Sequence, residues 1–205
     1  MAARQLRVEW LNELIVENNF NYYATAHHLD DSIETYFINQ LRGTGISGLH
    51  GILPKNGHLI HPLLFASRND VNLFVNQNKL KWRDDSSNNE TKYLRNKVRH
   101  NLIPLLEEIN PDVKQVLKSN MERILAIEEI YKTKIDEYKT SLWVNDSDYF
   151  KIRLRPLLTY NQPETILFEL IKEFGFNFSQ ASQILDSAKF ESTGAIISSI
   201  THELL

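Results

Sequence analysis

The densest group of reactive side chains lies at residues 27–35, His-His-Leu-Asp-Asp-Ser-Ile-Glu-Thr. Two imidazoles and three carboxylates are groups that proteins use to bind metal ions and to transfer protons. In a helix that begins near Asp31, the side chains of Asp31 and Glu34 would share one face. The same spacing fits a capping box, with Asp31 as N-cap and Glu34 at N3, which would be purely structural. Capping leaves Asp30 and the two histidines unexplained, so both interpretations stay open.

A second group lies between Arg42 and Gly51, where four of the seven glycines fall. Glycine lets the backbone adopt left-handed conformations and approach a ligand closely, and Arg42 would suit an anion. A loop that needs several turns explains the run equally well. A third group, residues 92–100, holds four cations and no acid. Arg95 and Arg99 would share a helix face and suit phosphate, although a charge run is more often a solvated face.

The elements expected around these groups alternate between helix and strand. Apolar residues recur at helical spacing over 2–18 and 32–42, and the aromatic-rich segment 20–26 between them is typical of a strand. The His–Asp group therefore falls where a strand gives way to a helix, which is where ligands bind in open α/β sheets. The remaining expected elements are a strand or hairpin arm at 58–64, a helix at 67–79 opened by Ser67, helical structure from Tyr93 with new helices at Pro104 and Pro111, a helix of ~25 residues from Val113, strands at 149–154 and 195–200, and helices at 163–174 and 179–188.

Composition excludes several classes of function. The chain has 205 residues and a net charge of -3, so contact with nucleic acid must come from a local patch. The absence of cysteine excludes disulfides, cysteine-ligated metals and thiol nucleophiles within these residues. No apolar run reaches the roughly 18 residues of a membrane span, and the N-terminus lacks the apolar core of a signal peptide. We expect a cytoplasmic protein with no membrane partner.

In their order and spacing the three groups resemble the tRNA(Ile)-lysidine synthetases, bacterial members of the PP-loop ATP pyrophosphatases. The matching segments are 27–35, 41–49, 62–64, 83–88 and 93–104, so the resemblance is strong over residues 1–111 and weaker beyond. It implies an α/β fold. Residues 1–110 would form the C-terminal part of a parallel-sheet PP-loop nucleotide-binding domain, 111–140 a helical linker, and 141–205 a small α+β domain that contacts substrate or tRNA.

The resemblance also implies a reaction. A ligase of this family uses ATP and Mg²⁺ to adenylate the C2 carbonyl oxygen of the wobble cytidine in tRNA(Ile) with a CAU anticodon. The amine of free lysine then displaces AMP and leaves lysidine. The site residues that the resemblance implies are Asp31 and Glu34 for lysine and catalysis, Arg95 and Arg99 for catalysis, His27, His28, Asp30, Arg42, Gly43 and Gly45 for the nucleotide, Asp30 also for the metal, and Arg83, Arg95, Arg99 and His100 for tRNA.

One departure from the family is large. Its members open with a strand that carries a Ser-Gly-Gly-x-Asp-Ser loop around the pyrophosphate, whereas no glycine precedes Gly43 here. We therefore expect a fragment that by itself binds ATP poorly and does not ligate lysine. We also expect either self-association, with a homodimer as one form, or a rearranged packing of residues 1–50, and greatest stability over 93–138.

Three other functions share features with this sequence. PP-loop enzymes that thiolate tRNA need cysteine, which is absent. A metal-dependent phosphoesterase built on His27, His28, Asp30 and Asp31 stays open, with further ligands available from His50, His58, His61 and His100. A non-catalytic RNA-binding or scaffolding module that keeps the fold also stays open.

Overall fold

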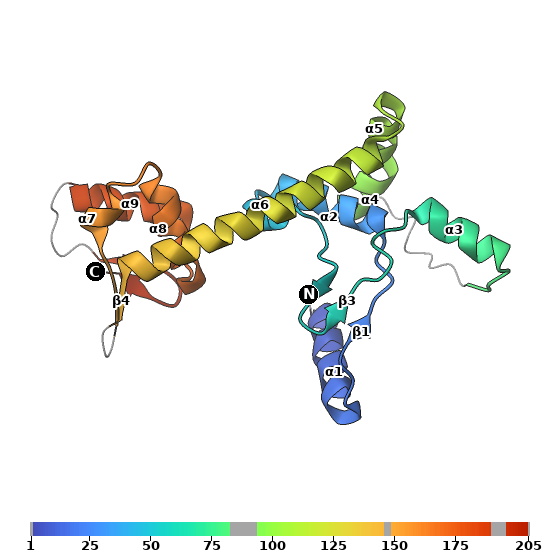
Figure 1. The fold of residues 1–205 in the computed structure, drawn as a ribbon, viewed down its shortest axis with the longest axis horizontal. Coiled ribbons are helices and arrows are strands. Elements are labelled where there is room, and N and C mark those ends of the chain that lie inside the picture. The colour runs from blue at the N-terminus through green and yellow to red at the C-terminus, as the bar shows by residue number, and fades with distance from the viewer. Residues whose placement is uncertain (1, 83–93, 146–148, 190–195, 205) are drawn as a thin grey trace. The chain divides into compact units, whose positions relative to one another are not determined.

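The computed structural model describes residues 2–82, 94–145, 149–189 and 196–204 (Figure 1). The chain divides into two compact units, Met1–Glu128 and Glu129–Leu205, and the boundary falls within one long helix, α6. The described residues combine helices with short strands, which confirms the expected mixed α/β character. No helix among them is both long enough and apolar enough to cross a membrane.

The first unit carries the three reactive groups. Its elements are α1 (Ala2–Asn18), β1 (Tyr23–Ala24), α2 (Leu29–Arg42), the 3-10 turn η1 (Ile46–Gly48), β2 (Lys55–Asn56), β3 (Leu59–Ile60), α3 (Arg68–Gln77), α4 (Leu94–Lys97), the π-helical turn η3 (Val98–Leu102), α5 (Ile103–Ile109) and the first part of α6 (Val113–Leu142). Ser67 caps α3, and Pro104 lies in the first turn of α5, both as expected. Pro111 was wrongly predicted to open a helix, because it lies in the turn before α6.

A small sheet orders the first unit. β1 pairs with β3 in parallel, Tyr23 opposite Leu59, and β3 pairs with β2 antiparallel, giving the order β1-β3-β2. The expected strand at 20–26 and hairpin arm at 58–64 are therefore present, with two paired residues in each strand. One further parallel bridge joins His28 to Leu63 just before α2 begins. Because one strand pair is parallel and the other antiparallel, the described residues do not form a wholly parallel sheet.

The core of the first unit lies under α2. Ile33 is fully buried and packs with Leu29, Val98, Ile103 and Met121, which joins α2 to η3, α5 and α6. Figure 1 shows α2 beside the first part of α6. The polar residues in the first turns of α2 lie against α4 and η3, since Glu34 pairs with Arg95 and Arg99.

The second unit has its own core. It contains the rest of α6, β4 (Trp143–Asn145), β5 (Phe150–Ile152), α7 (Leu154–Leu157), α8 (Pro163–Ile171), the 3-10 turn η4 (Lys172–Phe174), α9 (Phe178–Lys189), β6 (Ile197–Ser198) and β7 (Glu203–Leu204). Leu142, Leu157, Leu167 and Leu185 are all fully buried in one apolar cluster. β4 pairs antiparallel with β5, and the expected closing strand, β6, pairs antiparallel with β7.

Candidate functional site

Three carboxylates lie on the first two turns of α2. The helix begins at Leu29, with His28 as its N-cap, and Asp31 occupies N3. The interpretation with Asp31 as N-cap and Glu34 at N3 does not hold. Asp31 instead forms the capping box of α2 with His28, whose backbone N–H donates to Asp31 Oδ2 over 3.1 Å. Asp30 and Asp31 fall in the first turn, where the helix dipole favours negative charge.

Glu34 binds two arginines. Arg99 donates from Nε to Glu34 Oε1 over 2.6 Å and from Nη2 to Oε2 over 3.1 Å. Arg95 donates from Nε to Oε2 over 2.9 Å. The Glu34 side chain is 1% exposed, so both guanidinium groups compensate a carboxylate that is out of water. The hydrogen bond to Glu34 raises the pKa of Arg99 above its ordinary value.

Asp30 is held by groups from two other elements. Lys114 of α6 lies 2.8 Å from Asp30 Oδ1, and the backbone N–H of Arg68 donates to Oδ2 over 2.7 Å. Burial alone would raise the pKa of Asp30, but these two partners outweigh it and lower the pKa below its usual range. Lys114 also lies 2.9 Å from Glu107. No local sequence pattern marks Lys114 as a partner of Asp30.

Asp31 is the most exposed of the three carboxylates, with its side chain 14% accessible. Its closest side-chain cation is Arg99, whose Nη2 lies 3.5 Å from Asp31 Oδ1. That distance is long for a charge-assisted hydrogen bond. Asp31 is therefore the carboxylate best able to accept a further cation.

The histidines lie beside these carboxylates. His28 Nε2 is 3.5 Å from Asp31 Oδ2, and His28 Nδ1 is 3.8 Å from Asp30 Oδ2. His27 Nδ1 is 2.7 Å from Thr25 Oγ1, and its ring meets the edge of His61 with centroids 5.0 Å apart. The described residues contain no group of three or more His, Cys, Asp or Glu side chains arranged to hold a metal ion.

The glycine run lies at the other end of α2. Gly43, at φ +72°, is the C-cap of α2, and Gly45 is the N-cap of η1. Because α2 rises about 1.5 Å per residue, Arg42 lies roughly 16 Å along the axis from Asp31. The structure therefore does not bring Arg42, Gly43 and Gly45 together with the carboxylates.

An ion pair that no sequence pattern indicates joins the end of the glycine run to α6. The imidazole of His50 lies 3.3 Å from the buried carboxylate of Glu128 on α6. Gly51 packs tightly against α2 as well. A Cβ on Gly51 would come within 2.3 Å of Ser32 Oγ and 2.8 Å of Met121 Sδ. Close packing of the chain thus explains Gly51 without a ligand.

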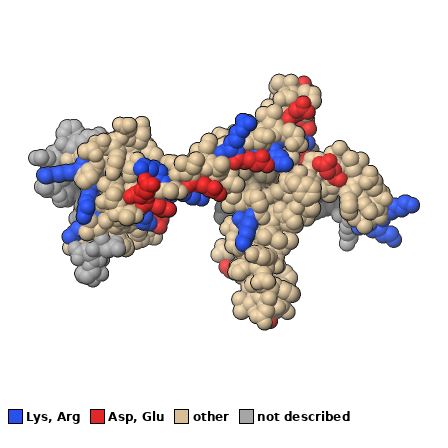
Figure 2. Space-filling view, viewed as in Figure 1, with Lys and Arg blue, Asp and Glu red and all other residues tan. Residues whose placement is uncertain are grey.

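The predicted tRNA-binding residues are only partly placed. Arg95 and Arg99 join the carboxylates, and exposed His100 follows Arg99 within η3. Arg83 and the polar segment 83–88 lie outside the described residues. On the face drawn in Figure 2, basic and acidic side chains form small separate groups, in keeping with a net charge of -3.

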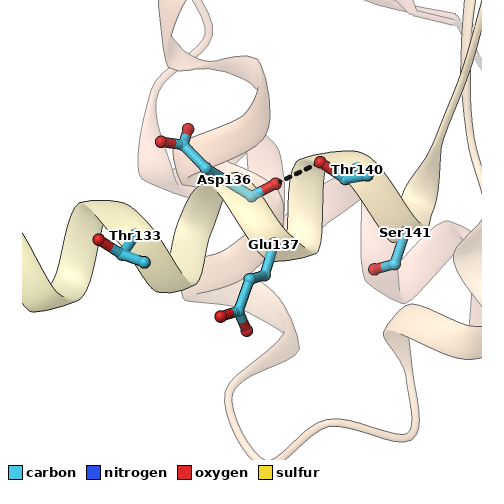
Figure 3. Close-up of a pocket in the computed structure, with 5 residues that line it drawn as sticks. All are labelled: Thr133, Asp136, Glu137, Thr140 and Ser141. Carbon is cyan, nitrogen blue, oxygen red and sulfur yellow. Dashed lines mark hydrogen bonds between the residues drawn. The ribbon is translucent and has the colours of Figure 1, made fainter.

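One hollow in the second unit measures about 500 Å³. It is lined by α6 residues alone, namely Thr133, Asp136, Glu137, Thr140 and Ser141 (Figure 3). All three hydroxyls donate to backbone carbonyls of the same helix, and the lining includes two acids and no cation. This hollow therefore offers little to an anionic ligand.

Two family models match this chain. A family model described as a PP-loop domain matches residues 1–106. The chain belongs to the PP-loop family. A second model, described as TilS substrate binding domain, matches residues 145–205 of this PP-loop protein.

The relatives of this PP-loop protein agree with the resemblance seen in its motifs. It is 41% identical to the tRNA(Ile)-lysidine synthase of Bacteroides thetaiotaomicron over 91% of its own length and 43% of that protein. It is 38% identical to the synthase of Parabacteroides distasonis over its whole length and 46% of that protein. The chain thus spans less than half the length of these relatives. The predicted resemblance to the tRNA(Ile)-lysidine synthetases is confirmed.

Proposed function

We propose that this chain carries part of the active site of an ATP-dependent ligase that attaches free lysine to the wobble cytidine of tRNA(Ile) with a CAU anticodon. The names of the relatives and the two matched family models support the proposal. The observation that carries it is the contact of Asp31 and Glu34 with Arg95 and Arg99, because the reaction brings an ammonium group and phosphates to one place.

The reaction needs two opposite kinds of electrostatic stabilisation. ATP supplies an adenylate on the C2 oxygen of cytidine and releases pyrophosphate. The lysine amine then forms the new C–N bond at C2 as the C–O bond to AMP breaks, and the amine loses a proton. A carboxylate must hold the incoming lysine, and cations must face the phosphate charge.

The contacts suggest how the residues divide these tasks. Asp31 accepts the lysine ammonium, because it is the most exposed carboxylate and has the longest contact to a cation. Glu34 contributes to the same anionic site and holds Arg95 and Arg99 in place. Arg95, whose side chain is 42% exposed, turns the rest of its guanidinium toward phosphate or tRNA. His28 lies next to both aspartates on the nucleotide side.

Asp30 does not fit the role of a magnesium ligand. Mg²⁺ needs free carboxylate oxygens, yet Asp30 Oδ1 faces Lys114 and Oδ2 accepts from the backbone N–H of Arg68. We therefore assign no step of the reaction to a metal bound by Asp30.

The test uses a chimera in which this chain replaces the matching residues of the Parabacteroides distasonis relative. With ATP, labelled lysine and a tRNA(Ile) transcript bearing CAU, the chimera should place label in the tRNA. The unaltered relative is the positive control, and a transcript with another anticodon should stay unlabelled. A chimera with native circular dichroism that consumes ATP but labels no tRNA would overturn the proposal.

A further inference from the structure

An aromatic pocket lies in the second unit, where the end of α6 meets the β4–β5 hairpin and η4. It measures about 480 Å³ and is lined by Lys139, Thr140, Trp143, Phe150, Glu173 and Phe174. We call these six residues the aromatic pocket. Its volume falls within the range of about 300–1,000 Å³ that is usual for sites that bind small molecules.

Three rings form the walls. The centroid of Trp143 lies 5.4 Å from that of Phe150 and 5.7 Å from that of Phe174, and Phe150 lies 6.0 Å from Phe174. Phe150 is nevertheless 61% exposed, so one wall of the pocket presents a large apolar ring to solvent. An exposed ring beside two partly covered rings is a surface on which a flat aromatic group can stack.

A cation and a carboxylate lie together in the same pocket. Lys139 Nζ is 2.6 Å from Glu173 Oε1 and 4.5 Å from the centre of the Trp143 ring. Both side chains are about half exposed, and an ion pair in water is weak enough for a ligand to replace. The pocket thus offers a hydrogen-bond donor and an acceptor side by side above an aromatic wall. The indole N–H of Trp143 is buried and has no hydrogen-bond partner among the described residues.

We propose that the aromatic pocket binds an unpaired base of an RNA. Every nucleobase has an apolar face for stacking, and the Watson–Crick edge of A, C or G carries both a donor and an acceptor for Glu173 and Lys139. A purely apolar partner would leave the Lys139–Glu173 pair without a role in binding. Phe150, Glu173 and Phe174 lie within the segment matched by the substrate-binding model. The identity of the RNA rests on the proposed function. The evidence for the pocket does not depend on that function.

The test uses the fluorescence of Trp143 in the full 205-residue chain. Trp10→Phe and Trp82→Phe leave Trp143 as the sole tryptophan, and both altered residues are more than half exposed. A single-stranded RNA heptamer containing all four bases should quench this fluorescence, and a duplex of the same sequence should not. Equal quenching by duplex and single strand would overturn the inference, as would no quenching.

A matched pair of variants locates the binding. Phe150→Ala should weaken binding of the heptamer at least tenfold, and Phe150→Tyr should restore most of it. Tyr149→Ala is the control, since Tyr149 is similarly exposed, at 55%, but does not line the pocket. Equal losses in the two alanine variants would overturn the assignment to this pocket.

The chimera separates this inference from the proposed function. In it, Phe150→Ala should raise the KM for tRNA and leave the KM for lysine unchanged. An unchanged KM for tRNA in an active chimera overturns the pocket alone. Pocket-dependent RNA binding together with an inactive chimera overturns the proposed function alone.

Discussion

Arg99 forms a bidentate pair with the buried carboxylate of Glu34, donating from Nε over 2.6 Å and from Nη2 over 3.1 Å. Two parallel contacts fix the orientation of a guanidinium as well as its position. Arg99 belongs to a π-helical turn, whereas Glu34 belongs to α2, so this pair joins two separate elements across the candidate site. The contribution of this pair to stability can therefore be measured apart from its proposed role in the reaction.

Glu34→Gln should destabilise the first unit by about 3 kcal/mol, because it leaves two arginines facing a buried neutral group. The matched control is Glu107→Gln, which removes a carboxylate that is 39% exposed and should cost no more than about 1 kcal/mol. The free energy of unfolding in urea measures both. Equal, small losses would show that the arginines do not depend on Glu34.

The Asp30–Lys114 pair should stabilise the chain only within a defined pH window. The folded pKa of Asp30 lies below the ordinary 3.8, so its contribution is present above pH 3.8 and is lost as the pH falls through the folded value. Burial lowers the pKa of Lys114, but hydrogen bonds to Asp30 and Glu107 raise it above the ordinary 10.5. The contribution of Lys114 is therefore present below pH 10.5 and is lost as the pH rises through the folded value.

Urea unfolding of the chain and of Asp30→Asn, between about pH 3 and pH 9, measures the acid side of this window. The difference in stability should be constant near neutrality and should shrink below pH 3.8. Glu137→Gln is the control, because its pair with Lys134 is more than half exposed and should contribute little at any pH. A difference that stays constant down to the lowest pH would contradict the assignment.

Gly51→Ala should cost about 2 kcal/mol more than Gly57→Ala. Both glycines have positive φ, at +71° and +59°, so both alanines carry the same left-handed strain of about 1 kcal/mol. Only at position 51 would the new Cβ also collide with Ser32 and Met121. Melting temperatures of the two variants provide the comparison. Equal losses would mean that the glycine run is not tightly packed against α2.

Local sequence was enough to predict most elements but not their exact starts. Apolar spacing and Ser67 predict α3, because a helix and its cap depend on neighbouring residues. The start of α2 was placed too late. Its first residue, Leu29, donates its N–H to the carbonyl of Ala66, and such a long-range bond leaves no trace in the local pattern. The apolar stripe of α1 was also predicted, yet Leu6 and Trp10 stay more than half exposed, since a pattern does not say what covers it.

In the candidate site, too, local sequence predicted the residues but not their long-range contacts. Residue type and spacing identified Asp30, Asp31, Glu34, Arg95 and Arg99. The structure joins Asp31 and Glu34 to the two arginines, whereas Asp30 contacts Lys114 and the amide of Arg68. Residue type and spacing could not show that Lys114 and the backbone N–H of Arg68 bind the two carboxylate oxygens of Asp30, because both partners come from distant segments. The family resemblance also implied that Arg42, Gly43 and Gly45 line the same site as the carboxylates, although the length of α2 separates them.

Asp31→Asn in the chimera separates binding of lysine from capping of α2. Asparagine keeps an oxygen that can accept from the His28 N–H, so the melting temperature should change little. The charge that faces the lysine ammonium is lost, so the KM for lysine should rise at least tenfold while the KM for ATP stays within about twofold. Asp70→Asn, which makes the same change in the capping box of α3, is the control and should alter neither constant. A lowered melting temperature with unchanged kinetics would mean that Asp31 serves the helix alone and that lysine is held elsewhere.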